Sequence, residues 1–263
     1  MTTSAMHIAR TGLDAQDTRM RVISNNLANV STTGFKRDRA SFETLSYQVV
    51  TAAGAQSTAE SKYATGLNLG TGVRVQGTSR TETQGSMNQT GNSLDLALDG
   101  DGYFQVQMPG GQLGYTRAGN FSRSPEGLLI TSQGYQVMPG ITVPANATQI
   151  TIGLDGTVSA TVPGQDQAQN LGQIQVASFP NPAGLTATGD NFLTESAASG
   201  AANLGVAGED GRGRVRQGTL EASNVNVVEE LVDMIETQRA YEVNSKMISA
   251  TDDMLKYVNQ NMS

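Results

Sequence analysis

The sequence predicts a discontinuous α+β fold, in which long N- and C-terminal helices pair as a coiled coil and an all-β domain is inserted between them. Two observations lead to this prediction. At both chain ends, apolar residues recur alternately every three and four positions, as in a helical seam. Between the ends, apolar residues alternate every second position, as in half-buried strands. Extended segments connect the two patterns.

The N-terminal helix is expected over residues 4–30, which corresponds to roughly 40 Å at 1.5 Å per residue. Gly34 follows it and can take the positive φ that ends many helices. The seam of this helix has one polar member and consists of Met6, Ala9, Leu13, Gln16, Met20, Ile23, Leu27 and Val30.

The C-terminal helix is expected to begin near Asn226, because Asn226 and Glu229 have the spacing of a capping box. Its apolar stripe repeats every seventh residue at Met234, Tyr241, Ile248, Leu255 and Met262. Neighbouring residues widen the stripe, namely Leu231, Ile235, Met247, Met254 and Val258.

Polar residues interrupt both seams, as at Gln16, Gln238 and Asp252, so an isolated helix pair is expected to be marginally stable. Neighbouring copies of the chain could supply the missing burial, and contacts that do not close into a ring would produce a helical filament. Heptad stripes are, however, more often an intramolecular core. Periodicity alone leaves both interpretations open.

Short strands separated by turn residues are predicted in the middle of the chain and indicate a compact all-β domain. The predicted strands are residues 94–98, 104–108, 128–131, 135–138, 149–152, 157–162 and 173–179. The small, polar segments 51–61 and 196–213 are predicted to be connectors. The expected parts are a terminal-helix domain (1–34 with 224–263), a connecting region (35–80 with 202–223) and an inserted β domain (81–201).

Composition narrows the function classes. The absence of cysteine excludes disulfides and cysteine metal sites, and the net charge of −7 disfavours binding to nucleic acid or anionic lipid. No apolar run is long enough to span a membrane, and the N-terminus lacks the pattern of a cleaved signal peptide. We therefore expect protein partners, no nucleic acid and no membrane insertion.

Candidate chemical sites do not have the required spacing. A calcium loop starting at Asp99 or Asp95 would place Gly110 or Val106 where a bidentate glutamate is needed, so a β-turn is favoured at 99–102. His7 is the only histidine and has no nucleophile beside it in the sequence. We therefore predict no enzyme activity, no catalytic residue, no cofactor and no metal.

Two polar segments have alternative interpretations. The basic segment 212–216 (RGRVR) could bind phosphate or nucleic acid, but the acidic chain favours a solvated or subunit-contacting loop. The amides of Asn25, Asn26 and Asn29 could cap the first helix, or they could form hydrogen bonds between packed subunits.

Four motifs resemble those of the flagellar rod and hook family, and the resemblance covers nearly the whole chain. They are residues 25–36 (NNLANVSTTGFK), 101–104 (DGYF), 115–121 (YTRAGNF) and 218–227 (GTLEASNVNV), the last followed by EELV at 229–232 and QRAYE at 238–242. Chain length, residues 11–16 (TGLDAQ) and an insertion over 47–67 are similar to a rod subunit. The hook protein is usually longer and lacks this insertion. The rod-specific segment includes Tyr47, Gly54, Ala55, Gln56 and Ser57.

The resemblance implies a structural subunit that self-assembles helically into a rigid, torque-transmitting shaft in the basal body, where it spans the periplasm. It implies as partners other copies of the chain, proximal rod proteins, the hook protein, the surrounding P and L rings and the flagellar export apparatus, with export that needs no cleaved signal. Alternatives are a proximal rod or hook subunit, or a carbohydrate-binding or hydrolytic β domain. The residues expected at the assembly interface are Met6, Ala9, Leu13, Ile23, Asn25, Asn26, Leu27, Asn29, Leu231, Met234, Tyr241, Ile248 and Leu255.

Overall fold

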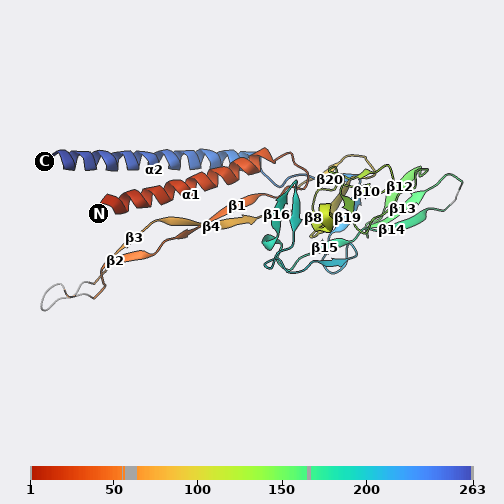
Figure 1. Ribbon diagram of the computed structural model, residues 1–263, viewed down its shortest axis with the longest axis horizontal. Helices are drawn as coiled ribbons and strands as arrows, with labels where there is room; N and C mark the ends of the chain where they lie inside the picture. The colour runs from red at the N-terminus through yellow and green to blue at the C-terminus, as the bar shows by residue number, and fades with distance from the viewer. Residues whose placement is uncertain (1, 55, 57–63, 165–166, 262–263) are drawn as a thin grey trace. The chain divides into compact units, whose positions relative to one another are not determined.

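The structure, a computed structural model of the chain, describes residues 2–54, 56, 64–164 and 167–261. It confirms the predicted fold class, because a long helix at each end of the chain flanks a β-rich region (Figure 1). The chain divides into two compact units. Unit 1 contains residues 1–27, 38–79 and 226–263, and unit 2 contains residues 28–37 and 80–225. The finer division into three parts stays a prediction.

Unit 1 contains the two helices, α1 (Thr2–Ala28) and α2 (Val227–Asn261). Helix α2 begins where predicted, because the side-chain oxygen of Asn226 accepts a 3.1 Å hydrogen bond from the N–H of Val228. Helix α1 ends before the expected Val30, and Gly34 does not cap it. Gly34 has a φ of 67°, but its N–H donates to the carbonyl of Glu221. Over their described residues, neither helix has an apolar stretch that could cross a membrane.

A two-stranded ribbon occupies much of the predicted connecting region. Strand β1 (Asp38–Thr44) pairs with β4 (Val73–Arg80), and β2 (Tyr47–Thr51) pairs antiparallel with β3 (Leu67–Gly70). The whole ribbon belongs to unit 1 except Arg80, the last residue of β4. We call β2 and β3 the ribbon tip.

Unit 2 contains the remaining strands, nine of which form one sheet and three another, with two further pairs. The larger sheet contains β7 (Tyr103–Gln107), β8 (Leu113–Thr116), β9 (Ser122–Arg123), β10 (Leu129–Ile130), β11 (Gln136–Val137), β15 (Val176–Ser178), β16 (Thr186–Gly189), β17 (Phe192–Thr194) and β18 (Asn203–Gly205). The smaller sheet contains β12 (Gln149–Ile152), β13 (Thr157–Thr161) and β14 (Gln169–Gln173). The pairs are formed by β5 (Met87–Gln89) with β20 (Thr219–Glu221), and by β6 (Leu96–Asp99) with β19 (Arg214–Gln217).

Strands β6 and β7 are more deeply buried than their alternating sequence predicted. Leu96, Ala97 and Leu98 are all inaccessible to solvent, and so is almost all of Gln105 on β7. The prediction of half-buried strands is therefore wrong here, because small or hydrogen-bonded side chains allow the second face to be covered as well. Gln105 donates from Nε2 to the hydroxyl of Tyr115 at 3.5 Å.

The last strands before α2 complete unit 2. Strand β19 pairs antiparallel with β6 and places Val215 in the core. Strand β20 pairs with β5, and residues 28–37 also belong to this unit. Unit 2 therefore depends on segments from both flanks of its sequence.

Candidate assembly interface

Small and polar side chains make the contacts that join α1 to α2. The Arg19 guanidinium lies 3.2 Å from the Asp233 carboxylate. A Cβ atom at Gly12 would lie 3.1 Å from the side-chain nitrogen of Asn244, so the helices approach closely there. On α2, Thr237 is fully buried. The helix pair thus uses a largely polar side of α2.

The large apolar residues of α2 lie mostly outside this contact. Val228, Leu231, Val232 and Ile235, which we call the α2 patch, are 43–69% exposed. Further along the helix, Tyr241, Val243, Met247, Met254 and Tyr257 are also exposed. Monomeric soluble proteins rarely expose contiguous apolar surface of this kind without a binding role.

The ribbon tip carries a second exposed apolar surface. Its side chains are 44–62% exposed and belong to Tyr47, Val49, Val50, Leu67 and Leu69. Among the described residues, all large exposed apolar side chains belong to unit 1 except Leu113, Leu154 and Leu204. Exposed apolar surface is therefore concentrated in unit 1.

The residues expected at the assembly interface fall into three groups by burial. Buried residues are Ala9, Ile23 and Asn26; half-buried residues are Met6, Leu13, Leu27, Asn29, Met234 and Ile248; exposed residues are Asn25, Leu231 and Tyr241. The side chain of Leu255 lies outside the described residues. In the rod-specific segment, Tyr47, Gly54 and Gln56 are exposed, whereas Ala55 and Ser57 lie outside the described residues.

Asn26 joins the end of α1 to both the ribbon and α2. Its Nδ2 donates to the carbonyl of Asp38 at 2.9 Å and to the carboxylate of Glu230 at 3.2 Å. Its Oδ1 accepts from the N–H of Asp38 at 2.9 Å. Asn26 and Glu230 are each 1% exposed. The side chain of Asn26 therefore forms its hydrogen bonds within the chain, and Asn29 likewise accepts from the hydroxyl of Thr32 at 3.1 Å.

Replacing Asn26 with alanine is expected to lower the free energy of unfolding by about 2–3 kcal/mol, because three buried hydrogen bonds are lost. Far-UV circular dichroism during urea unfolding would measure the change. Ser24→Ala is the control, because Ser24 is exposed on the same helix and its replacement should cost no more than about 0.5 kcal/mol. Equal effects of the two substitutions would contradict this role for Asn26.

In unit 2, charged residues from three of the four sequence motifs meet in one buried cluster. The Lys36 ammonium lies 2.7 Å from one carboxylate oxygen of Glu221, and the Arg117 guanidinium lies 3.7 Å from the other. All three side chains are at most 4% exposed. We call Lys36, Arg117 and Glu221 the Glu221 cluster.

Backbone groups complete the cluster. Lys36 donates to the carbonyl of Thr83 at 2.8 Å, and Glu221 accepts from the N–H of Gly85 at 3.0 Å. Burial lowers the pKa of Lys36, although the hydrogen bond to Glu221 opposes this shift. Sequence reasoning did not single out these three residues. The sequence did contain a signal for this cluster, because each of three motifs has one charged residue among mostly uncharged ones.

The remaining motif, residues 101–104, contacts the Glu221 cluster through Tyr103. The Arg117 guanidinium lies 5.8 Å from the centre of its ring. The hydroxyl of Tyr103 donates to Glu82 at 2.8 Å. The pKa of Tyr103 is raised, mainly by burial and secondly by the charge of Glu82. The neighbouring Tyr115 donates to Glu195, and burial together with this bond raises the pKa of Tyr115 to about 12.

These tyrosines predict a loss of stability in alkali. An unfolded chain releases phenolic protons near pH 10, so the folded state binds more protons above that pH. The free energy of unfolding should therefore fall as the pH rises from 10 to about 12. In Tyr115→Phe this fall should be shallower, as measured by urea unfolding at successive pH values. An unchanged slope would contradict the assignment.

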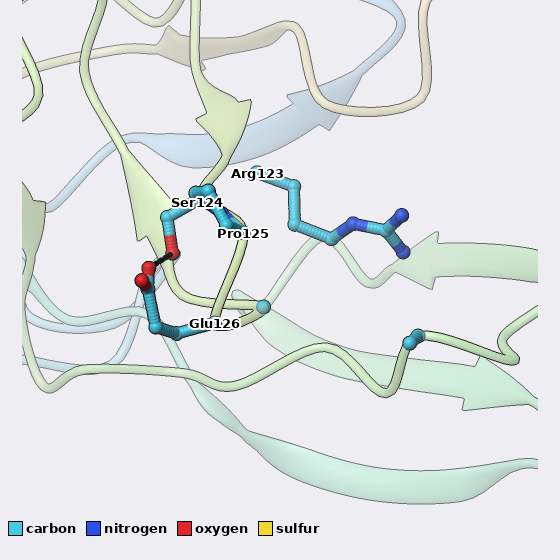
Figure 2. Close-up of a pocket in the computed structure, with 6 residues that line it drawn as sticks. Arg123, Ser124, Pro125 and Glu126 are labelled. Atoms are coloured by element: carbon cyan, nitrogen blue, oxygen red, sulfur yellow. Dashed lines mark hydrogen bonds between the residues drawn. The ribbon is translucent and has the colours of Figure 1, made fainter.

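The surface clefts of unit 2 do not form a catalytic arrangement in the described residues. A cleft of about 340 Å³ is lined by Arg123, Ser124, Pro125, Glu126, Gly127 and Ala145. Ser124 donates to Glu126 at 2.8 Å, which lowers the pKa of Glu126, while Arg123 points away from this pair (Figure 2). A serine beside an ionised carboxylate, with no histidine, lacks the general base of a hydrolase. In the described part of the chain, no group of three or more acidic or histidine side chains could hold a metal ion.

The basic segment 212–216 has a structural explanation. Arg212 is buried and contacts Asp210 at 3.1 Å, whereas Arg216 on β19 forms an exposed ion pair with Asp99 at 2.6 Å. Val215, between Arg214 and Arg216, points into the core. The arginines therefore do not form one continuous basic surface.

Three family descriptions match successive parts of the chain. Residues 6–36 match "Flagella basal body rod protein", residues 97–160 match "Flagellar hook protein FlgE/F/G D1 domain", and residues 216–261 match "Flagellar basal body rod FlgEFG protein C-terminal". The first and third matches cover the two terminal motifs, and the second covers both central ones.

Similar proteins align over almost the whole chain. The chain is 49% identical to the flagellar basal-body rod protein FlgG of Buchnera aphidicola subsp. Acyrthosiphon pisum, over 97% of this chain and 98% of that protein. It is 48% identical to FlgG of Caulobacter vibrioides, over the same shares of the two chains. The flagellar basal-body rod protein FlgF of Caulobacter vibrioides is 34% identical over 92% of each chain. Between these two proteins of one organism, the chain is more similar to FlgG.

Proposed function

Because the chain belongs to the family of flagellar basal-body rod proteins and is a non-enzymatic structural subunit of the distal rod, we propose that its copies assemble helically through unit 1 into a stiff, torque-transmitting shaft. The observation that supports this mechanism is the concentration of exposed apolar side chains in unit 1. Assembly of many copies would remove this surface from water.

The α2 patch is proposed as a principal contact between copies. Full burial of an aliphatic side chain contributes about 1.5–3 kcal/mol, so covering the exposed halves of these four residues would contribute on the order of 4 kcal/mol. Helix α1 already contacts another side of α2, through Glu230, Asp233 and Asn244. The patch is therefore available to a second copy without opening the helix pair.

A filament also requires that each copy uses two different surfaces, because contacts between unlike surfaces can continue indefinitely. Unit 1 offers the α2 patch and the ribbon tip as separate apolar surfaces. We propose that the ribbon tip, whose strand β2 lies in the rod-specific segment (47–67), braces neighbouring copies. Two contact regions in each copy would resist bending better than one.

The wider assembly follows from the place of a distal rod subunit. We propose contacts with proximal rod proteins at one end of the shaft, with the hook protein at the other, and with the P and L rings around it. The rod would cross the periplasm after delivery by the flagellar export apparatus without a cleaved signal. The relatives' names support assembly with flagellar components in the basal body.

Sedimentation and electron microscopy of two purified chains test the proposal. The full chain is compared with residues 28–225, a span that keeps every segment of unit 2 and removes both helices. The full chain should form filaments above a critical concentration, and the shortened chain should stay unassembled. Filaments of the shortened chain, which keeps the ribbon (residues 38–79) but lacks the helices, would contradict assembly through the terminal helices of unit 1.

A further inference from the structure

Helix α1 meets the ribbon at Thr11. The N–H of Val73, at the start of β4, donates to the hydroxyl oxygen of Thr11 at 3.4 Å. The preceding residue, Gly72, has a φ of 120°, and a Cβ atom there would overlap that oxygen. The Thr11 hydroxyl in turn donates to the carbonyl of Ile8 at 2.8 Å, which fixes its orientation. Only glycine satisfies both the backbone conformation and the close approach.

This contact lies where the ribbon changes from one strand pair to the other. The carbonyl of Gly72 accepts from the N–H of Leu45 at 2.9 Å, and the hydroxyl of Thr71 donates to the carbonyl of Ser46 at 2.6 Å. Leu45 and Ser46 connect β1 to β2, while Thr71 and Gly72 connect β3 to β4. Thr11 therefore supports the ribbon at the base of its tip.

The residue after Thr11 contacts a different element. Gly12 allows the side chain of Asn244 on α2 to approach α1, as described above. Two adjacent residues of α1 thus contact the ribbon on one side and α2 on the other. Thr11 and Gly12 begin the segment 11–16, whose sequence is similar to that of a rod subunit, and neither has a role in the function proposed so far.

We propose that the contact between Thr11 and Gly72 is a positioning joint that fixes the direction of the ribbon tip relative to the helix pair. This inference rests on the proposed assembly function. An isolated two-stranded ribbon is itself only marginally rigid. The five residues of β2 extend about 16 Å, so a rotation of about 20° at the joint would move the end of the tip by about 5 Å. Such a movement would misplace the tip against a neighbouring copy.

Distance measurements on the full chain test the joint without requiring assembly. The chain has no cysteine, so spin labels can be placed at Ser24→Cys on α1 and Gln48→Cys on β2, both exposed positions. Pulsed electron paramagnetic resonance should give one narrow distance distribution for the parent chain, and Thr11→Ala should broaden it at least about twofold. Thr18→Ala is the control. The hydroxyl of Thr18 donates to a carbonyl of α1, that of Asp14, just as Thr11 donates to Ile8, but among the described residues it has no bond to the ribbon.

A double-mutant cycle tests the contact itself. Gly72→Ala alone introduces both the unfavourable φ and the overlap with the Thr11 hydroxyl. In a Thr11→Ala background that overlap is gone, and the unfavourable φ remains together with a milder approach of 3.3 Å between the two Cβ atoms. The effect of Gly72→Ala on the unfolding equilibrium constant should therefore be at least about fivefold smaller in that background. Gly77→Ala on β4 is the control, because a Cβ atom there has no neighbour within 4 Å.

These outcomes separate the joint from the assembly mechanism. Unchanged label distances in Thr11→Ala, or strict additivity in the cycle, would overturn the joint even if filaments form normally. Failure of the parent chain to form filaments, with broadened distances in Thr11→Ala, would count against assembly and leave the joint supported. Where filaments form, those of Thr11→Ala should be more curved than those of Thr18→Ala.

Discussion

Glu221→Ala is expected to destabilise unit 2 by about 3–5 kcal/mol, because it leaves the buried Lys36 and Arg117 without their carboxylate partner. The remaining bonds of these cations, to the carbonyls of Thr83 and Gly100, do not neutralise them. The substitution also removes the acceptor of the Gly85 N–H. Since residues 34–36, 83–85, 117 and 221 all meet here, their separation should affect the whole unit.

Urea unfolding followed by near-UV circular dichroism would measure this change, since Tyr103 and Tyr115 both lie in unit 2. Asp99→Ala is a matched control within unit 2, because Asp99 forms an ion pair of similar length, 2.6 Å, with Arg216 at the surface. An exposed pair contributes no more than about 1 kcal/mol. Comparable losses in the two variants would show that the buried cluster has no special role.

Ile235→Asp is expected to raise the critical concentration for assembly at least about 100-fold while leaving the subunit folded. The side chain is 50% exposed, so the folded monomer gains no buried charge. In an assembled contact, the variant loses about 1 kcal/mol of apolar burial and must also desolvate a carboxylate, which costs more. Each 1.4 kcal/mol changes an association constant about tenfold.

Sedimentation over a range of concentrations would measure the effect of Ile235→Asp. Leu154→Asp is its control, because Leu154 is a similarly exposed apolar residue, at 58%, on unit 2. Its critical concentration should stay unchanged. If Leu154→Asp prevented assembly and Ile235→Asp did not, the contact surface would have to be sought on unit 2.

The helices could be predicted from sequence because their signals are local. Asn226 marks the start of α2 through a bond to a residue two positions away, and the apolar period extends over many turns. The side of α2 that meets α1 was not predictable in the same way. On that side the half-buried Met234 and Ile248 of the apolar stripe alternate with polar residues such as Asn244, and the apolar period does not mark those polar residues.

The Glu221 cluster and the ribbon could not be predicted from local sequence patterns either. Lys36 and Glu221 are 185 positions apart, and no periodicity relates them. The ribbon tip has exposed apolar residues and few intramolecular neighbours, so it lacks the alternation of buried and solvated positions that identifies a strand. The family resemblance indicated that these segments matter, but only the structure shows their contacts.

The central claim is that copies assemble through unit 1. The most direct test is an electron cryomicroscopy map of filaments grown from the purified full chain, at a resolution that shows side chains. In this map, Val228, Leu231, Val232 and Ile235 of each copy should lie against a neighbouring copy. A map in which these four side chains face solvent, and in which neighbouring copies touch only through unit 2, would contradict it.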